Sequence, residues 1–159
     1  MVNKNIKWGE NVIELNEFIK IINECENRLP LLTLDEFFSE NKVEDSIAPN
    51  QCGFGRPSLA EIWDMFKKVE AVPNVAWVRV ALHDDTDIVE HNGKNVLELW
   101  GDSIVVCTSL RKRDLEKLVN CEWLCSGGAE EINIFDLDNL FSCRPIVPEG
   151  FRCFEIVWD

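Results

Sequence analysis

Two histidines bracket a dense group of acidic side chains in the sequence. His83 and His91 enclose four carboxylates, which are Asp84, Asp85, Asp87 and Glu90. Such a group could bind a hard metal ion, but the glycine and terminal glutamate of a calcium loop are not in register here. A general base at His83 would need a positioned nucleophile, and none is recognisable. The segment is therefore interpreted as a solvated acidic loop, with a metal-dependent or acid–base enzyme as the alternative.

The late cysteines are a second group able to bind a metal. Cys121 and Cys125 are four residues apart on an expected helix, and Cys143 and Cys153 follow. The close Cys-x-x-Cys pair of structural zinc sites is missing, so buried thiols are favoured over zinc, and neither a metal nor a cofactor is expected. The count of seven cysteines is odd and no signal peptide pattern precedes them, which predicts reduced thiols in the cytoplasm.

The net charge argues against some classes of binding partner. The chain has 29 acidic and 16 basic residues, a formal net charge of -13. This field repels phosphates and anionic lipid head groups, so neither a nucleic acid nor a membrane is expected as a partner. No apolar run approaches the roughly 20 residues of a membrane-spanning helix. The run Gly53-Phe54-Gly55 lacks the third glycine and the lysine of nucleotide-binding loops, so it predicts no nucleotide site.

Periodicity predicts the helices that must position these groups. An amphipathic N-terminal helix is expected over about 11–27, where Asn11 and Glu14 match a capping box. Thr33 and Ser58 are typical N-caps of two further helices. Between those helices, the polar and glycine-containing stretch of about 39–57 predicts a loop-rich segment, and such loops often form working surfaces.

The remaining chain predicts a sheet. Strands are expected at 75–82, 96–100, 103–108 and 151–158, with Asn92-Gly93 as a hairpin turn. A helix capped by Ser109 and ended by Gly127 precedes the last strand. This order favours an α+β fold, with a mainly antiparallel sheet and helices packed on one face. The length of 159 residues fits one domain over 1–159.

Acidic residues fall in three patches beside loops, at 33–50, 84–102 and 130–138. Patches that share a face would complement a basic protein such as a nuclease, whereas dispersed patches would form a solvated surface. The residues expected first at a partner interface are Asp35, Glu36, Asp84, Asp85, Asp87 and Glu90.

Segments of the chain resemble a bacterial family of small uncharacterised proteins. They are residues 29–38, 46–50 and 148–152 together with Val157-Trp158-Asp159. These proteins are similar in style to acidic immunity proteins, which neutralise a toxin delivered by neighbouring cells. The resemblance implies, by analogy, a non-enzymatic protein that binds a cognate toxin through electrostatic and aromatic contacts. A general protein-interaction module is the alternative.

Overall fold

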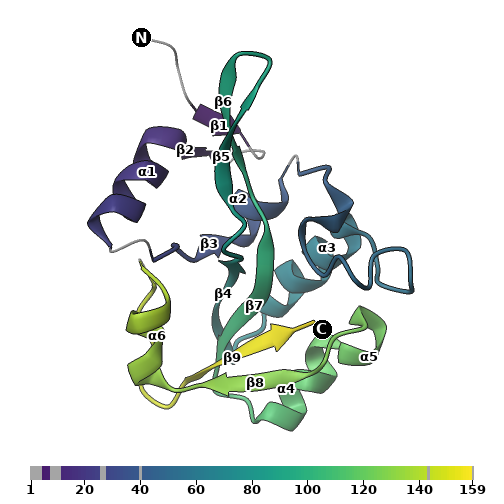
Figure 1. The fold of residues 1–159 in the computed structure, drawn as a ribbon. Coiled ribbons are helices and arrows are strands. Elements are labelled where there is room, and N and C mark those ends of the chain that lie inside the picture. The colour runs from purple at the N-terminus through teal and green to yellow at the C-terminus, as the bar shows by residue number, and fades with distance from the viewer. Residues whose placement is uncertain (1–4, 8–11, 26–27, 40, 143, 159) are drawn as a thin grey trace.

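The core of the fold is a five-stranded antiparallel sheet (Figure 1). The computed structural model describes residues 5–7, 12–25, 28–39, 41–142 and 144–158. The strand order is β3-β4-β7-β9-β8, with bounds Leu32–Thr33, Val75–Leu82, Gly101–Thr108, Arg152–Val157 and Ala129–Ile132. Helices pack on this sheet, so the predicted α+β class with a mainly antiparallel sheet is confirmed.

Both faces of the sheet are buried, which explains why its strands alternate only weakly in sequence. Val78 and Val80 of β4 lie opposite Val106 and Ile104 of β7, and all four belong to the larger core cluster. The intervening side chains, such as Val105, point to a smaller cluster on the other face. The same strand register therefore places alternate side chains in the two core clusters on opposite faces of the sheet.

The helices divide unequally between the two faces. The larger cluster is covered by α1 (Leu15–Glu24), α2 (Leu34–Phe38), α3 (Leu59–Glu70), α4 (Lys112–Val119) and α5 (Cys121–Leu124). The smaller cluster receives Leu137 of α6 (Ile134–Leu140), together with Phe141, Val147 and Phe151 after it. In Figure 1, α6 lies to the left of the sheet, whereas α3 and α5 lie to its right.

Two predicted helix starts are confirmed by their capping bonds. Thr33 Oγ1 accepts from the Glu36 amide at 3.1 Å, and Glu36 Oε1 accepts from the Thr33 amide at 2.8 Å. Ser58 and Glu61 form the same reciprocal pair at the start of α3. Each cap stabilises its helix by about 1 kcal/mol.

The N-terminal helix is shorter than the expected 11–27. It begins at Leu15, because Val12–Glu14 form strand β2 and pair with β1 (Asn5–Lys7). Glu14 is therefore a strand residue, and Asn11, the other residue of the predicted capping box, lies outside the described residues. Strand pairing has overridden the local helical pattern.

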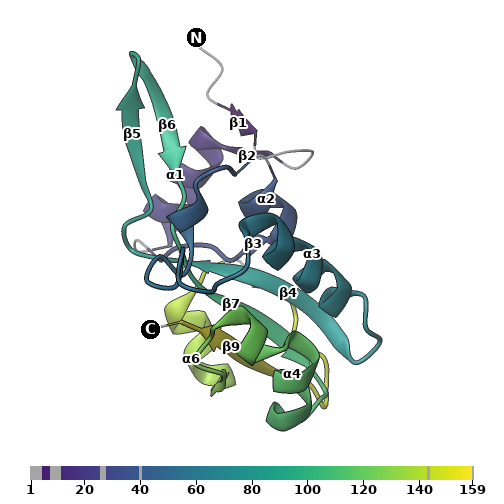
Figure 2. The ribbon, with the colours of Figure 1, turned by 90° about the vertical axis from the view of Figure 1, so that its right-hand side faces the viewer.

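The predicted Asn-Gly hairpin is confirmed. Strands β5 (Asp87–His91) and β6 (Lys94–Glu98) are joined by Asn92 and Gly93, whose φ angles are 53° and 76°. Positive φ at both positions is the requirement of a type I′ turn. Figure 2 shows the hairpin as an arm that continues beyond β4 and β7. The strand expected at 96–100 corresponds to β6, which ends at Glu98.

The loop-rich segment of 39–57 is organised by one arginine. Its only helical turn in the described residues is a 3-10 turn over Glu44–Ser46. Arg56 is buried, and its guanidinium donates to the Glu44 carbonyl at 2.7 Å, the Ile47 carbonyl at 2.6 Å and the Glu44 carboxylate at 3.1 Å. The same carboxylate accepts from the Leu59 amide, which ties the loop to α3. Within the described ranges, no helix combines the length and apolar character needed to cross a bilayer.

Candidate protein-interaction site

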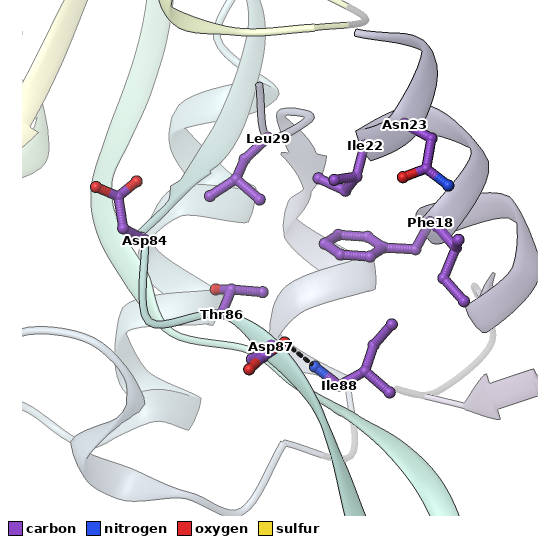
Figure 3. Close-up of a pocket in the computed structure, with 9 residues that line it drawn as sticks. Phe18, Ile22, Asn23, Leu29, Asp84, Thr86, Asp87 and Ile88 are labelled. Atoms are coloured by element: carbon purple, nitrogen blue, oxygen red, sulfur yellow. Dashed lines mark hydrogen bonds between the residues drawn. The ribbon is translucent and has the colours of Figure 1, made fainter. Parts of the chain in front are cut away.

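The loop of residues 83–87, which we call the acidic loop, forms one wall of a cavity of about 310 Å³ beside α1. Figure 3 shows Phe18 and Ile22 of α1 pointing toward Leu29 and the loop. Asp84 and Asp87 lie on the loop side of the same cavity. The arrangement joins an apolar wall to two exposed carboxylates, so it can take a group that is apolar along its length and cationic at its end.

Thr86 holds the acidic loop in place. Its side chain is buried, and its hydroxyl both accepts from the Trp100 amide at 3.0 Å and donates to the Trp100 carbonyl at 3.1 Å. The His83 amide donates to the same carbonyl at 2.7 Å, and the Thr86 amide donates back to the His83 carbonyl. These bonds fix the turn, so the carboxylates are presented from a defined backbone.

A second hollow, of about 160 Å³, lies on the other side of the acidic loop. His83, Asp85 and Asp102 line it, together with the indole rings of Trp100 and Trp158. His83 Nδ1 lies 3.0 Å from the Asp85 amide nitrogen and accepts its hydrogen bond. The carboxylate of Asp85 lies 3.4 Å from the same nitrogen.

Ser46, Ala48, Pro49 and Asn50 complete the lining of this second hollow. Ile47 bridges to Gly101 at the start of β7, and a methyl group on Gly101 would lie 3.0 Å from side-chain atoms of Ile47 and Phe37. This close approach admits only glycine without displacement of the neighbours. The loop ordered by Arg56 thereby becomes part of the candidate site.

Most carboxylates around the acidic loop have no ion-pair partner among the described residues. Among the described residues, no basic side chain forms an ion pair with Asp84, Asp87, Glu90 or Asp102. By contrast, Glu131 pairs with Arg152 at 3.1 Å. The acidic loop therefore keeps its charge for solvent or for a partner.

Two of the predicted acidic patches meet at Glu155. Burial raises the pKa of this carboxyl, and the nearby charges of Asp102 and Glu130 raise it further, while a hydrogen bond from Ser103 opposes them. Asp102 belongs to the second predicted patch and Glu130 to the third. We define the acidic surface as Asp84, Asp85, Asp87 and Asp102, which line the two hollows, together with Glu90 of the adjoining strand β5.

Asp35 and Glu36 lie outside this surface and have structural contacts. Asp35 accepts from Trp63 Nε1 at 3.1 Å and pairs with Lys67 at 3.2 Å, which joins α2 to α3. Glu36 completes the capping box of α2. Neither residue lines the cavity beside α1 or the second hollow. Of the six predicted contact residues, Asp84, Asp85 and Asp87 line one of the two hollows, and Glu90 lies further along β5.

The two histidines do not share a site. His83 is the first residue of the acidic loop, whereas His91 is the last residue of β5 beside the hairpin turn. The strand from Asp87 to His91 alone spans about 13 Å at roughly 3.3 Å per residue. A joint metal or acid–base centre of His83 and His91 is therefore not formed in this conformation.

The late cysteines are also separated. Cys121 packs against the larger core cluster, whereas Cys153 belongs to the smaller cluster on the other face of the sheet. Cys143 lies outside the described residues. Within the described part of the chain, no three His, Cys, Asp or Glu side chains are grouped to hold a metal ion.

Several residues of the site carry no recognisable signal in the sequence. Phe18 and Ile22 fit an ordinary apolar helix stripe, and Glu155 is one polar residue in a late strand. Only the tertiary fold places the stripe beside the acidic loop and Glu155 beside Glu130. The local signal that did identify the site was the density of carboxylates at 84–90.

The fold and the site together define a single-domain α+β protein with an acidic surface beside an apolar cavity. The chain belongs to the uncharacterized protein YfbO family, whose model matches residues 13–156. No curated protein and no solved structure matches the chain.

Proposed function

We propose that this chain binds a basic protein through the acidic surface, as an immunity protein binds and neutralises a toxin. The observation that carries the proposal is the acidic loop, whose Asp84 and Asp87 lie on a fixed backbone and form no ion pair with a basic side chain among the described residues. We place this binding in the cytoplasm, where an odd number of cysteines fits reduced thiols.

The unneutralised charges support fast association with a basic partner. Clustered carboxylates raise the encounter rate with a positive surface and disfavour acidic competitors. The toxin class best suited to such a surface is a nuclease, because its own substrate groove must be positive to hold phosphates.

The cavity beside α1 supports slow dissociation of the complex, in addition to the fast association that the charges favour. Its apolar lining by Phe18, Ile22 and Leu29 can cover the stem of a lysine or arginine side chain, and Asp84 and Asp87 lie on the loop side of the same cavity, where a charged end could reach them. The partly exposed rings of Trp100 and Trp158 in the second hollow are of the residue type enriched in binding hot spots.

The direct test is co-expression of the chain with toxin domains encoded beside it. We expect a stoichiometric complex that survives purification and protects cells from the toxin. The Asp84→Lys variant is compared with Asp64→Lys, which makes the same change in net charge at an exposed position on α3.

The expected difference between these variants follows from Coulomb's law. At about 8 Å in water, one charge pair contributes about 0.5 kcal/mol, so charge reversal costs about 1 kcal/mol, or about fivefold in association rate. Asp64→Lys should leave the rate near wild type, and added salt should slow wild-type association. Equal rates for the two variants, or no complex with any adjacent toxin domain, would contradict the proposal.

A further inference from the structure

Two buried thiols face each other across the centre of the sheet. Cys107 of β7 and Cys153 of β9 are direct partners in the antiparallel register. Both side chains belong to the smaller core cluster, with exposures of 0% and 2%. Opposed residues in such a ladder have Cα atoms roughly 4.5 to 5.5 Å apart, inside the roughly 4.4 to 6.8 Å range of disulfides. The sheet thus places the two sulfurs within reach of a bond.

One of the two thiols, Cys153, belongs to a residue that lines a cavity. Cys153 lines a cavity of about 370 Å³, whose apolar lining includes Ile132, Leu137, Val147 and Phe151. Cys107, its partner on the neighbouring strand, is not among the residues that line this cavity. A small molecule entering the cavity therefore meets Cys153 first.

The surroundings of the pair favour a thiolate on Cys153. The Cys107 thiol donates a hydrogen bond that lowers the pKa of Cys153, and the positive charge of Arg144 lowers it further, against the opposing effect of burial. The same hydrogen bond and burial raise the pKa of Cys107. Arg144 is itself held by Asp138, with Nε and Oδ1 2.7 Å apart. An ordinary buried thiol in apolar surroundings would lack this assistance.

We propose that Cys153 is a site of thiol–disulfide exchange with low-molecular-weight disulfides, and that Cys107 resolves the adduct into a cross-strand disulfide. In the first step the Cys153 thiolate attacks one sulfur of R–S–S–R, a new Cys153–S–R bond forms, and one thiolate leaves and takes up a proton. In the second step the Cys107 sulfur loses its proton and attacks Cys153 Sγ, the bond between Cys153 Sγ and the R–S sulfur breaks, and the second R–S⁻ leaves and takes up that proton. The protein dithiol is oxidised by two electrons, and the small disulfide is reduced to two thiols.

This inference is independent of the proposed binding function. The acidic loop and the cavity beside α1 use none of the residues of the thiol site. Failure of one experiment therefore leaves the other proposal unaffected.

The test treats the folded full-length chain with oxidised glutathione and maps the products by peptide mass spectrometry without reduction. The expected product is a peptide pair linked through Cys107 and Cys153, with two glutathione thiols released for each link. The Cys107→Ala variant should instead accumulate one glutathione adduct on Cys153, because the resolving thiol is gone. The Cys153→Ala variant should leave Cys107 unmodified while folded. All variants also carry Cys143→Ser, so that this thiol cannot compete.

Peptide mapping of the wild-type chain tests the proposal even if a variant with a substitution in the core does not fold. A Cys153 that stays unmodified in the folded chain, under conditions that modify it fully in urea, would overturn the proposal. So would a stable glutathione adduct on Cys153 in the wild type without a link to Cys107. Circular dichroism of each variant establishes that the folded state is the one tested.

Discussion

Replacement of Arg56 by alanine should destabilise the protein strongly, because its guanidinium fastens the loop-rich segment to α3. The side chain is 2% exposed, and it donates to the carbonyls of Glu44 and Ile47 and to the Glu44 carboxylate. In Arg56→Ala the two carbonyls lose a charged donor and the carboxylate loses its cation.

The magnitude follows from the number and exposure of these bonds. Loss of one partner from a buried charge network costs about 3 to 5 kcal/mol, and each hydrogen bond to a charged group contributes about 1.5 to 3 kcal/mol. The Glu44 side chain is 54% exposed, so solvent screens the ion pair and the lower end applies. We expect the free energy of unfolding to fall by about 3 kcal/mol.

The assay is urea denaturation followed by tryptophan fluorescence, with Arg111→Ala as the matched control. Arg111 also pairs with a carboxylate, at 3.1 Å, but its side chain is 80% exposed. Its removal should cost less than about 0.5 kcal/mol. An Arg56→Ala variant that unfolds at the same urea concentration as Arg111→Ala would refute the assignment of Arg56 as the fastening of the loop.

Two other substitutions test the roles given to carboxylates. Asp35→Ala should lower the free energy of unfolding by about 1 kcal/mol, since Trp63 and Lys67 lose their acceptor. The same substitution should leave binding of a toxin partner unchanged. Weakened binding with normal stability would instead show that Asp35 contacts the partner. Glu155 has a raised pKa when folded, so the native state binds its proton more tightly and stability falls as pH rises through the range between its unfolded and folded pKa values. Glu155→Gln should therefore be more stable than wild type at neutral pH, by less than about 1 kcal/mol because the group is partly exposed. Urea denaturation at pH 7 measures the difference in stability. A variant less stable than wild type would contradict the expected increase.

Local chemistry predicted the elements whose cause is local. Thr33 and Ser58 begin helices because each hydroxyl caps an amide three residues later, and Asn92-Gly93 forms a hairpin because both can adopt positive φ. The same local reasoning extended α1 to residue 11, because the pairing of β2 with β1 is invisible to helical periodicity. Local periodicity also predicted one continuous helix from Ser109 to Gly127.

In the structure that later helix begins at Lys112 and is divided at Asn120, whose φ angle is 52°. Strand β8 and helix α6 follow it, and neither was predicted. Both are short elements, of 4 and 7 residues, and take their stability from packing on the sheet. Their sequences alone therefore contain too little periodicity to identify them.

The candidate site was predictable only where its residues are neighbours in sequence. The carboxylates from Asp84 to Glu90 could be identified from their density, whereas Phe18 joins them through folding alone. The opposition of Cys107 and Cys153 likewise depends on the register of two strands far apart in the chain. Contacts of this kind are set by sheet topology, which composition and local pattern do not specify.

The place of β9 in the sheet has a consequence for synthesis of the protein. This strand is late in the chain, yet it lies between β7 and β8 and pairs with both. Until residues up to Val157 have left the ribosome, β7 has one open edge and β8 has no partner strand in the sheet. An open edge can pair with another nascent chain. The sheet must therefore close after translation of β9, and a chaperone that covers β7 in the interval would raise the yield of folded protein.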